Sequence, residues 1–104
     1  MYLIIWEYLV KAERVAEFEE FYSTNGAWTR LFQKSKGFLA MELVQDEMHL
    51  HRYITIDRWT SSQDYESFRS QWKTEYAALD SRCEVFTEQE TLLGKWKSIL
   101  PETL

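Results

Sequence analysis

The chain of 104 residues has the length of one ordinary domain, and 45% hydrophobic with 28% charged residues is the composition of a globular protein. A formal net charge of −5 without any cluster of Lys and Arg argues against a nucleic-acid partner. Apolar runs fall short of the roughly 18 residues of a membrane span, and the amino terminus lacks the basic start of a signal peptide. We therefore expect a cytoplasmic protein with no membrane partner.

The first third of the sequence predicts a strand followed by a broken helix. Residues 2–10 are rich in β-branched and aromatic side chains, and only Glu7 interrupts two apolar faces, so both faces of this strand should be buried. Apolar residues then recur at helical spacing up to Tyr22, opposite an acidic side. The turn signal at residues 25–26 ends this helix, and the apolar stripe resumes in a short second piece around Trp28.

The remaining elements are a hairpin, a long helix and a last strand. Residues 38–45 and 51–59 alternate as strands, and their short connection predicts an antiparallel pair. A helix with hydroxyl residues at its start is expected from residue 62 to about 82, and a weaker strand over 85–93.

The domain organisation follows from this series. Residues 1–94 form one domain, and residues 95–104 form a tail in which Pro101 would stop any strand. The tail is apolar enough to dock on the domain through Trp96, Ile99 and Leu100.

The order of the elements predicts the α+β ferredoxin-like fold, β-α-β-β-α-β with a four-stranded antiparallel sheet. Right-handed crossovers place both helices on one face of such a sheet. The other face still carries apolar residues from the first three strands, and leaving them in water would cost stability and invite aggregation. We expect a homodimer through this open sheet face, since symmetric pairs are the commonest oligomers. A monomer that covers the face with a ligand, a foreign subunit or an amphipathic helix is the alternative.

Four local sequence patterns, together with this architecture, resemble those of a known protein family. They are GAWTRLF at residues 26–32, KGFL at 36–39, RYITIDRW at 52–59 and EYAALD at 75–80. With the element order, they make the chain from residue 2 to about residue 94 resemble the antibiotic biosynthesis monooxygenase-like family of dimeric α/β barrels. The resemblance concerns the fold more than the activity, because the family also includes haem-degrading enzymes, isomerases and members of unknown role.

The resemblance implies a pocket between the helices and the sheet. In the oxygenase members the substrate is an electron-rich polycyclic phenol whose deprotonated form passes an electron to O2 itself, so no cofactor is needed. The expected function is therefore cofactor-independent monooxygenation of a small aromatic or polyphenolic compound. The alternative is a non-catalytic small-molecule-binding or accessory homodimer of the same fold, because the sequence shows no evident pair of acid and base groups.

Haem degradation is disfavoured by the residues at the positions that the resemblance aligns. The haem-degrading members carry an Asn on the first strand and a Trp and a His on the second long helix. Here the first strand has Trp6 and Glu7, Phe68 stands at the Trp position, and the helix over 62–82 contains no His.

The candidate catalytic residues belong to the third strand. His51 is a candidate general base, because an imidazole exchanges protons near neutral pH. Tyr53 shares a strand face with Asp57 and Trp59, and its hydroxyl requires a partner if it is buried. His49 and His51 could share a metal ion, but no third ligand is evident beside them, so we expect no metal site.

The candidate substrate-binding residues are aromatic: Trp28, Trp59, Trp72 and Tyr76. Large rings at helical spacing more often pack a core than contact a ligand, so core packing is the alternative role for them. Trp28 follows the break at residues 25–26, where a short helical piece over a pocket could act as a gate.

Overall fold

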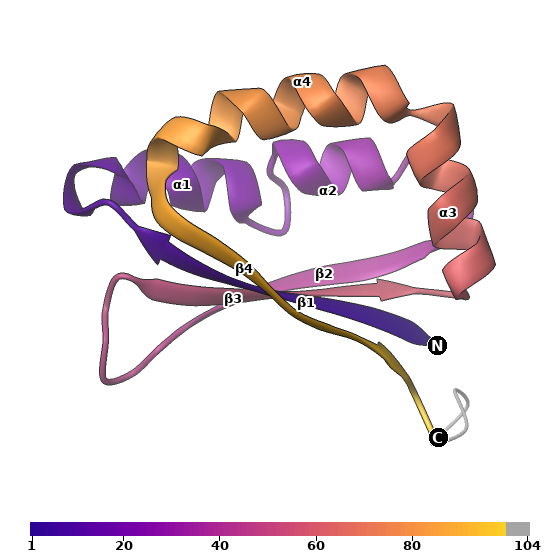
Figure 1. The fold of residues 1–104 in the computed structure, drawn as a ribbon, viewed down its shortest axis with the longest axis horizontal. Coiled ribbons are helices and arrows are strands. Elements are labelled where there is room, and N and C mark those ends of the chain that lie inside the picture. The colour runs from indigo at the N-terminus through magenta and orange to yellow at the C-terminus, as the bar shows by residue number, and fades with distance from the viewer. Residues whose placement is uncertain (100–104) are drawn as a thin grey trace.

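The structure is a computed structural model that describes residues 1–99. A single antiparallel sheet in the order β2-β3-β1-β4 lies beneath a layer of helices, which all cover the same face (Figure 1). In chain order the elements are β1 (Tyr2–Val10), a 3₁₀ helix (Ala12–Arg14), α1 (Val15–Tyr22), α2 (Ala27–Phe32), β2 (Phe38–Gln45), β3 (Arg52–Trp59), α3 (Ser62–Gln71), α4 (Lys73–Cys83), a second 3₁₀ helix (Glu84–Phe86) and β4 (Thr87–Lys97). This arrangement confirms the predicted α+β ferredoxin-like order.

The covered face of the sheet is built from alternate residues of the two central strands. In β1 these include Ile4, Tyr8 and Val10, all at most 4% exposed. In β3 they are Tyr53, Thr55, Asp57 and Trp59, which are all buried. The period of two therefore places a carboxylate, Asp57, among aromatic and aliphatic side chains.

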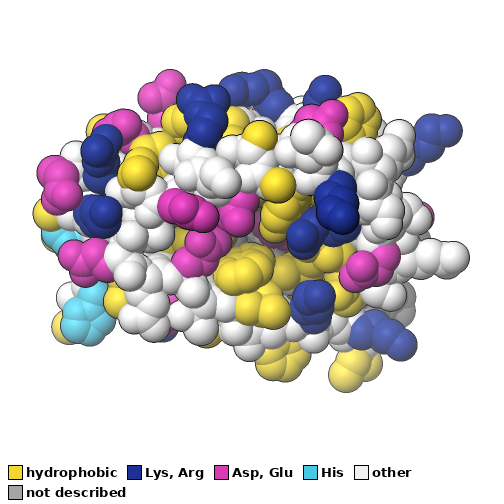
Figure 2. Space-filling view, turned by 45° about the horizontal axis from the view of Figure 1, so that its top comes forward, with side chains coloured by type: hydrophobic (Ala, Val, Ile, Leu, Met, Phe, Trp, Pro, Cys, Tyr) yellow, Lys and Arg dark blue, Asp and Glu magenta, His cyan; other side chains and the backbone are white. Residues whose placement is uncertain are grey.

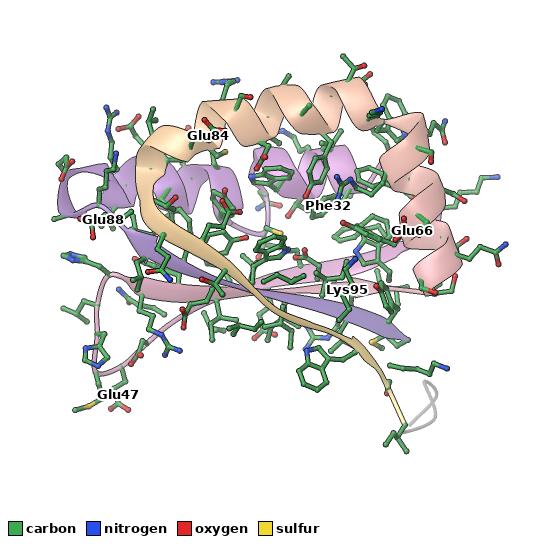
Figure 3. All side chains as sticks on the ribbon, in the orientation of Figure 1. Phe32, Glu47, Glu66, Glu84, Glu88 and Lys95 are labelled. Carbon is green, nitrogen blue, oxygen red and sulfur yellow. The ribbon has the colours of Figure 1, made fainter. Side chains whose placement is uncertain are left out.

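Aromatic rings fill most of the space between this face and the helices. Phe18 and Tyr22 of α1 stack with their ring centroids 4.3 Å apart, and Tyr8 of β1 lies 5.0 Å from Tyr22. Phe32 points from α2 toward the sheet (Figure 3), where its ring lies 5.4 Å from that of Trp59. Offset and edge-to-face pairs of this kind stabilise a core beyond the apolar area that they bury.

The long helix predicted over 62–82 is two helices. Trp72 separates α3 from α4 with a φ of −110° and a ψ of 30°, and α3 lies steeply across the end of α4 (Figure 1). Ser61 caps α3 by accepting a hydrogen bond from the Asp64 N–H at 3.1 Å. The apolar stripe continues through the break without a Gly or Pro, so the spacing alone does not reveal the change of direction.

The last strand is longer than predicted. It runs to Lys97 and includes Trp96, which the sequence placed in a tail. A side chain at Gly94 would lie only 2.9 Å from the Trp96 indole, and the register with β1 shifts at this point. Trp96 is 54% exposed and Ile99 97% exposed, while the rest of the predicted tail, residues 100–104, lies outside the described residues.

The opposite face of the sheet has no helix over it (Figure 1). It carries half-buried aliphatic side chains, which are Leu3, Ile5 and Leu9 of β1 and Ile54 and Ile56 of β3. Carboxylates on this face pair with arginines, as in Arg52 with Glu7 and Arg58 with Glu42. Within residues 1–99, no helix is long and apolar enough to cross a membrane.

Candidate functional site

A small cavity lies between the sheet and helices α2 and α4. Its volume is about 20 Å³, roughly the room of one water molecule. Rings form most of its wall, contributed by Trp6, Tyr8, Tyr22, Trp28, Phe32 and Tyr76. The rest of the lining comes from Met41, Thr55 and the carboxylates of Asp57, Asp80 and Glu90. We call this space the inner cavity.

A second space, the outer hollow, continues the inner cavity toward solvent. It has a volume of about 290 Å³ and is lined by Trp6, Arg69, Tyr76, Asp80 and Glu90. All of these except Arg69 also line the inner cavity, so the two spaces adjoin each other. Figure 2 shows acidic side chains gathered beside hydrophobic ones in a recess in the middle of this face. The outer hollow is close to the lower limit of small-molecule pockets.

Asp57 is the most unusual group in the inner cavity. Its side chain comes from the middle of β3, where its neighbours across the sheet are Ile4 and Met41. The residue is 6% exposed, and its Oδ1 has no hydrogen-bond partner among the described residues. Burial raises the pKa of this carboxyl from 3.8 to about 7. A buried carboxyl without a partner costs stability, so its presence in a cavity points to a chemical role.

The hydroxyl groups beside Asp57 bond to each other. Tyr8 Oη and Thr55 Oγ1 lie 3.1 Å apart, and both residues are at most 4% exposed. Burial first, and the nearby Asp57 carboxylate second, hold the pKa of the Tyr8 hydroxyl well above its usual value. Tyr8 therefore stays neutral at physiological pH, and of the acidic groups deep in the inner cavity Asp57 is the one that changes charge near pH 7.

The outer hollow is acidic on one side and cationic on the other. Asp80 of α4 and Glu90 of β4 form its acidic side, where burial and then the Asp80 charge raise the pKa of Glu90. Arg69 of α3 also lines this hollow, with its guanidinium carbon 3.8 Å from the ring centre of Tyr76. Its Nη1 donates a hydrogen bond of 2.9 Å to the Tyr65 hydroxyl. Arg69 is therefore held by two aromatic residues and pairs with neither carboxylate.

The four predicted substrate-binding residues divide into two groups. Trp28 and Tyr76 line the inner cavity and contact each other edge to face at 5.1 Å between ring centroids. Trp59 is fully buried against Phe68 and other rings, and it does not line the inner cavity. Trp72 lies at the α3–α4 junction with Lys34 Nζ 4.7 Å from its ring centre. The structure thus brings two of the four to the cavity and gives the other two packing positions.

The predicted catalytic residues lie away from both spaces. Tyr53 is 2% exposed, and its hydroxyl donates to Glu19 at 2.5 Å and accepts from Gln45 at 3.2 Å, which ties α1 to the sheet. His51 is exposed in the turn before β3, in a different surface hollow that His49 also lines. Their catalytic role stays a prediction, although the geometry favours Asp57 as the group that can meet a bound ring.

Asp57 could have been singled out from the sequence by its position. On the inward face of β3 it follows Tyr53 and Thr55 and precedes Trp59. A charged residue at an inward position of a central strand needs an explanation. The predicted lack of a metal site stays a prediction as well, although the described residues contain no group of three His, Cys, Asp or Glu side chains arranged to hold a metal ion.

Comparisons with known proteins agree with this architecture. The profile of antibiotic biosynthesis monooxygenases matches residues 1–73. Among solved structures, a mutant form of SnoaB, a cofactor-independent oxygenase from Streptomyces nogalater, superposes with a TM-score of 0.79 at 15% identity, covering 97% of this chain and 95% of SnoaB. PA3566 from Pseudomonas aeruginosa gives a TM-score of 0.72 at 17% identity, covering 95% of this chain and 94% of PA3566. No protein with a curated description matches the sequence. Because the profile covers most of the domain, the chain belongs to the antibiotic biosynthesis monooxygenase family.

Proposed function

We propose that the protein is a cofactor-independent monooxygenase that oxidises a small, electron-rich aromatic or polyphenolic compound, with Asp57 as the base. The observation that carries the proposal is the buried Asp57 carboxyl, which has an unpartnered oxygen and a pKa of about 7 in a cavity walled by rings. A base with a pKa near the operating pH is the most effective, since it is partly ionised and still basic. Family membership supports the same reaction type.

The reaction balances without a cofactor. The Asp57 carboxylate takes a proton from a phenolic hydroxyl or an activated ring CH2, and the electron pair of the broken bond stays on the substrate. The resulting anion gives one electron to O2, and the two radicals combine to a peroxide. Asp57 returns its proton to the peroxide anion, and loss of water from the hydroperoxide leaves a carbonyl, so that CH2 and O2 become C=O and H2O. The protein supplies the base, the orientation and the exclusion of water.

A ring must displace side chains to reach Asp57, because the inner cavity has room for about one water molecule. Trp28 is placed to move, since it belongs to α2, a helix of only six residues. The turn before α2 is tight, and a side chain at Gly26 would lie 2.5 Å from two carbonyl oxygens of α1. We propose that α2 and Trp28 open the inner cavity to the ring and close behind it.

Oxygen uptake tests the proposal directly. The purified protein is mixed with a panel of hydroquinones and anthrones, and uptake is recorded for the wild type and for Asp57→Asn. Asn keeps the shape of the side chain but cannot accept the proton, so we expect turnover to fall by about 10²–10⁴-fold. His51→Ala and Tyr53→Phe are the matched comparisons, and both should retain turnover if Asp57 is the base.

The outcomes separate the competing explanations. Loss of turnover in His51→Ala with full activity in Asp57→Asn would identify His51, at the hairpin end of β3, as the base instead of Asp57. Ligands that bind without any oxygen consumption, in the wild type as well as the variants, would favour the non-catalytic binding or accessory protein instead.

We also propose that the protein acts as a homodimer through the open sheet face. Half-buried aliphatic residues of β1 and β3 lie on this face, and no described helix covers them. Trp96 of β4, 54% exposed, pairs with Leu3 of β1 and extends the same surface. Sedimentation at micromolar concentration should give twice the mass of the chain, and a stable single chain would contradict the proposal. The cytoplasmic location is part of this proposal, and cell fractionation tests it.

A further inference from the structure

The acidic side of the outer hollow has no partner. Asp80 and Glu90 come from different elements, α4 and β4, yet they lie close enough for the charge of Asp80 to raise the pKa of Glu90. In the described part of the chain, neither carboxylate forms an ion pair or a side-chain hydrogen bond, although Arg69 lines the same space. Two adjacent carboxylates without a counter-ion repel each other, and a cation placed between them relieves that repulsion.

The lining of the inner cavity independently favours a ligand with cationic or hydrogen-bond-donating groups. Asp57 is more than nine-tenths buried, lines the cavity, and has a carboxylate oxygen without a donor. No Lys or Arg is among the residues that line the inner cavity. The two nearest hydroxyls, of Tyr8 and Thr55, bond to each other. A ligand group that reaches the inner cavity therefore meets carboxylates and no Lys or Arg, which favours a donor or a cation there.

Aromatic rings line both spaces beside the carboxylates. Trp6 and Tyr76 line both spaces, so a flat ring passing between them stays in contact with aromatic faces. Aromatic faces also favour a cation placed nearby. Asp80 and Glu90 line both spaces and Asp57 lines only the inner cavity, so a ligand meets the paired carboxylates and these rings before it meets the buried carboxylate.

We propose that the site selects a hydroxylated aromatic amine, with the protonated amine bound by Asp80 and Glu90 and the ring hydroxyl directed toward Asp57. This inference rests on the proposed function, because it names the substrate class of the same site. It disfavours carboxylated and phosphorylated aromatics, which would bring a negative charge to an inner cavity that three carboxylates and no Lys or Arg line.

Binding to a matched series of phenols tests the charge preference separately from catalysis. The probes are tyramine, tyrosol and 4-hydroxyphenylacetate, which share the phenol ring and carry a positive, neutral and negative side chain. Isothermal titration without oxygen, at pH 7.5, should rank tyramine first, tyrosol second and 4-hydroxyphenylacetate last. We expect a step of up to about fivefold in Kd between tyramine and tyrosol, which corresponds to the upper end of what exposed ion pairs give.

Variants identify the side chains that cause the preference for tyramine. The double variant Asp80→Asn with Glu90→Gln should remove the preference for tyramine and leave the Kd of tyrosol within about twofold. Glu88→Gln is the matched control, because Glu88 is on the same strand but lines a different hollow. Equal affinities in the wild type, strongest binding of 4-hydroxyphenylacetate, or no binding of tyramine at millimolar concentration would each overturn the inference. Oxygen uptake with neutral hydroquinones would still occur in those cases if the proposed function alone is correct.

Discussion

The carboxylates on the two faces of the sheet have opposite surroundings. On the open face, Glu7 lies 2.5 Å from Arg52 and Glu42 lies 3.2 Å from Arg58, and these ion pairs stay in contact with water. On the covered face, Asp57 has apolar neighbours across the sheet and an oxygen without a partner. The charges of the open face cost little to maintain, whereas the carboxylate of the covered face destabilises the fold when it is ionised. This difference is why we assign chemistry to Asp57 and not to the paired carboxylates.

Removing an aromatic side chain should change the free energy of unfolding much more on the covered face than on the open face. Trp59 is fully buried among rings of α2 and α3, so Trp59→Ala should lower the free energy of unfolding by about 3–5 kcal/mol. Trp96 on the open face is 54% exposed, and Trp96→Ala should cost under about 1 kcal/mol in the isolated chain. Urea unfolding of both variants measures the contrast. A cost of Trp96→Ala that grows with protein concentration is what the proposed homodimer predicts, whereas an equal loss in both variants at the lowest concentration would contradict the contrast.

The second-largest effect that we expect is a pH-dependent contribution of Asp57 to the free energy of unfolding. Its pKa in the folded state is about 7 against 3.8 ordinarily, so folding favours the protonated form. The contribution of Asp57 is fully present below about pH 4, declines as the pH rises, and is lost above about pH 7, a change of up to about 4 kcal/mol.

Asp57→Asn isolates this contribution. The difference in unfolding free energy between wild type and Asp57→Asn should change across pH 4–7 and stay constant above it, as followed by urea unfolding at each pH. Glu42→Gln on the open face serves as the control and should show no such trend. Parallel pH profiles for the wild type and Asp57→Asn would mean that the carboxyl is hydrated or paired in solution.

The ion pairs of the open face should have the smallest effect. Arg58→Ala removes the partner of Glu42, whose side chain is 53% exposed, so we expect a loss of no more than about 1 kcal/mol. Thermal unfolding at low and at high salt checks this, since screening should abolish even that small difference. Below the protein concentration at which the proposed homodimer forms, a loss several times larger would contradict this expectation.

Much of this fold follows from sequence periodicity. β-Branched and aromatic residues mark 2–10 as a strand, alternation marks 38–45, and the Asn25–Gly26 signal correctly separates the two short helices. The break at Trp72 could not be predicted in this way, because the apolar stripe keeps its spacing and packing alone turns the chain there. The length of β4 was underestimated because Gly94, which makes room for the Trp96 indole, looks like the end of a strand.

The site was harder to predict than the fold. Trp28 and Tyr76 line the inner cavity while Trp59 and Trp72 do not, yet all four are large rings at apolar positions. Which rings border a cavity depends on how the helices cross the sheet, and one sequence does not contain that information. The position of Asp57 in β3 was visible from alternation, but its lack of a partner depends on residues brought in by other strands.

The pKa of Asp57 is the most direct test of whether this carboxyl is buried without a partner and can act as the base. A ¹³C NMR titration of the aspartate carboxyls, with the Asp57 signal identified by its absence in Asp57→Asn, measures it in the folded protein. We expect a midpoint near pH 7. A midpoint near the ordinary value of 3.8 would contradict it, because a carboxyl that ionises so readily is neither buried without a partner nor suited to act as the base.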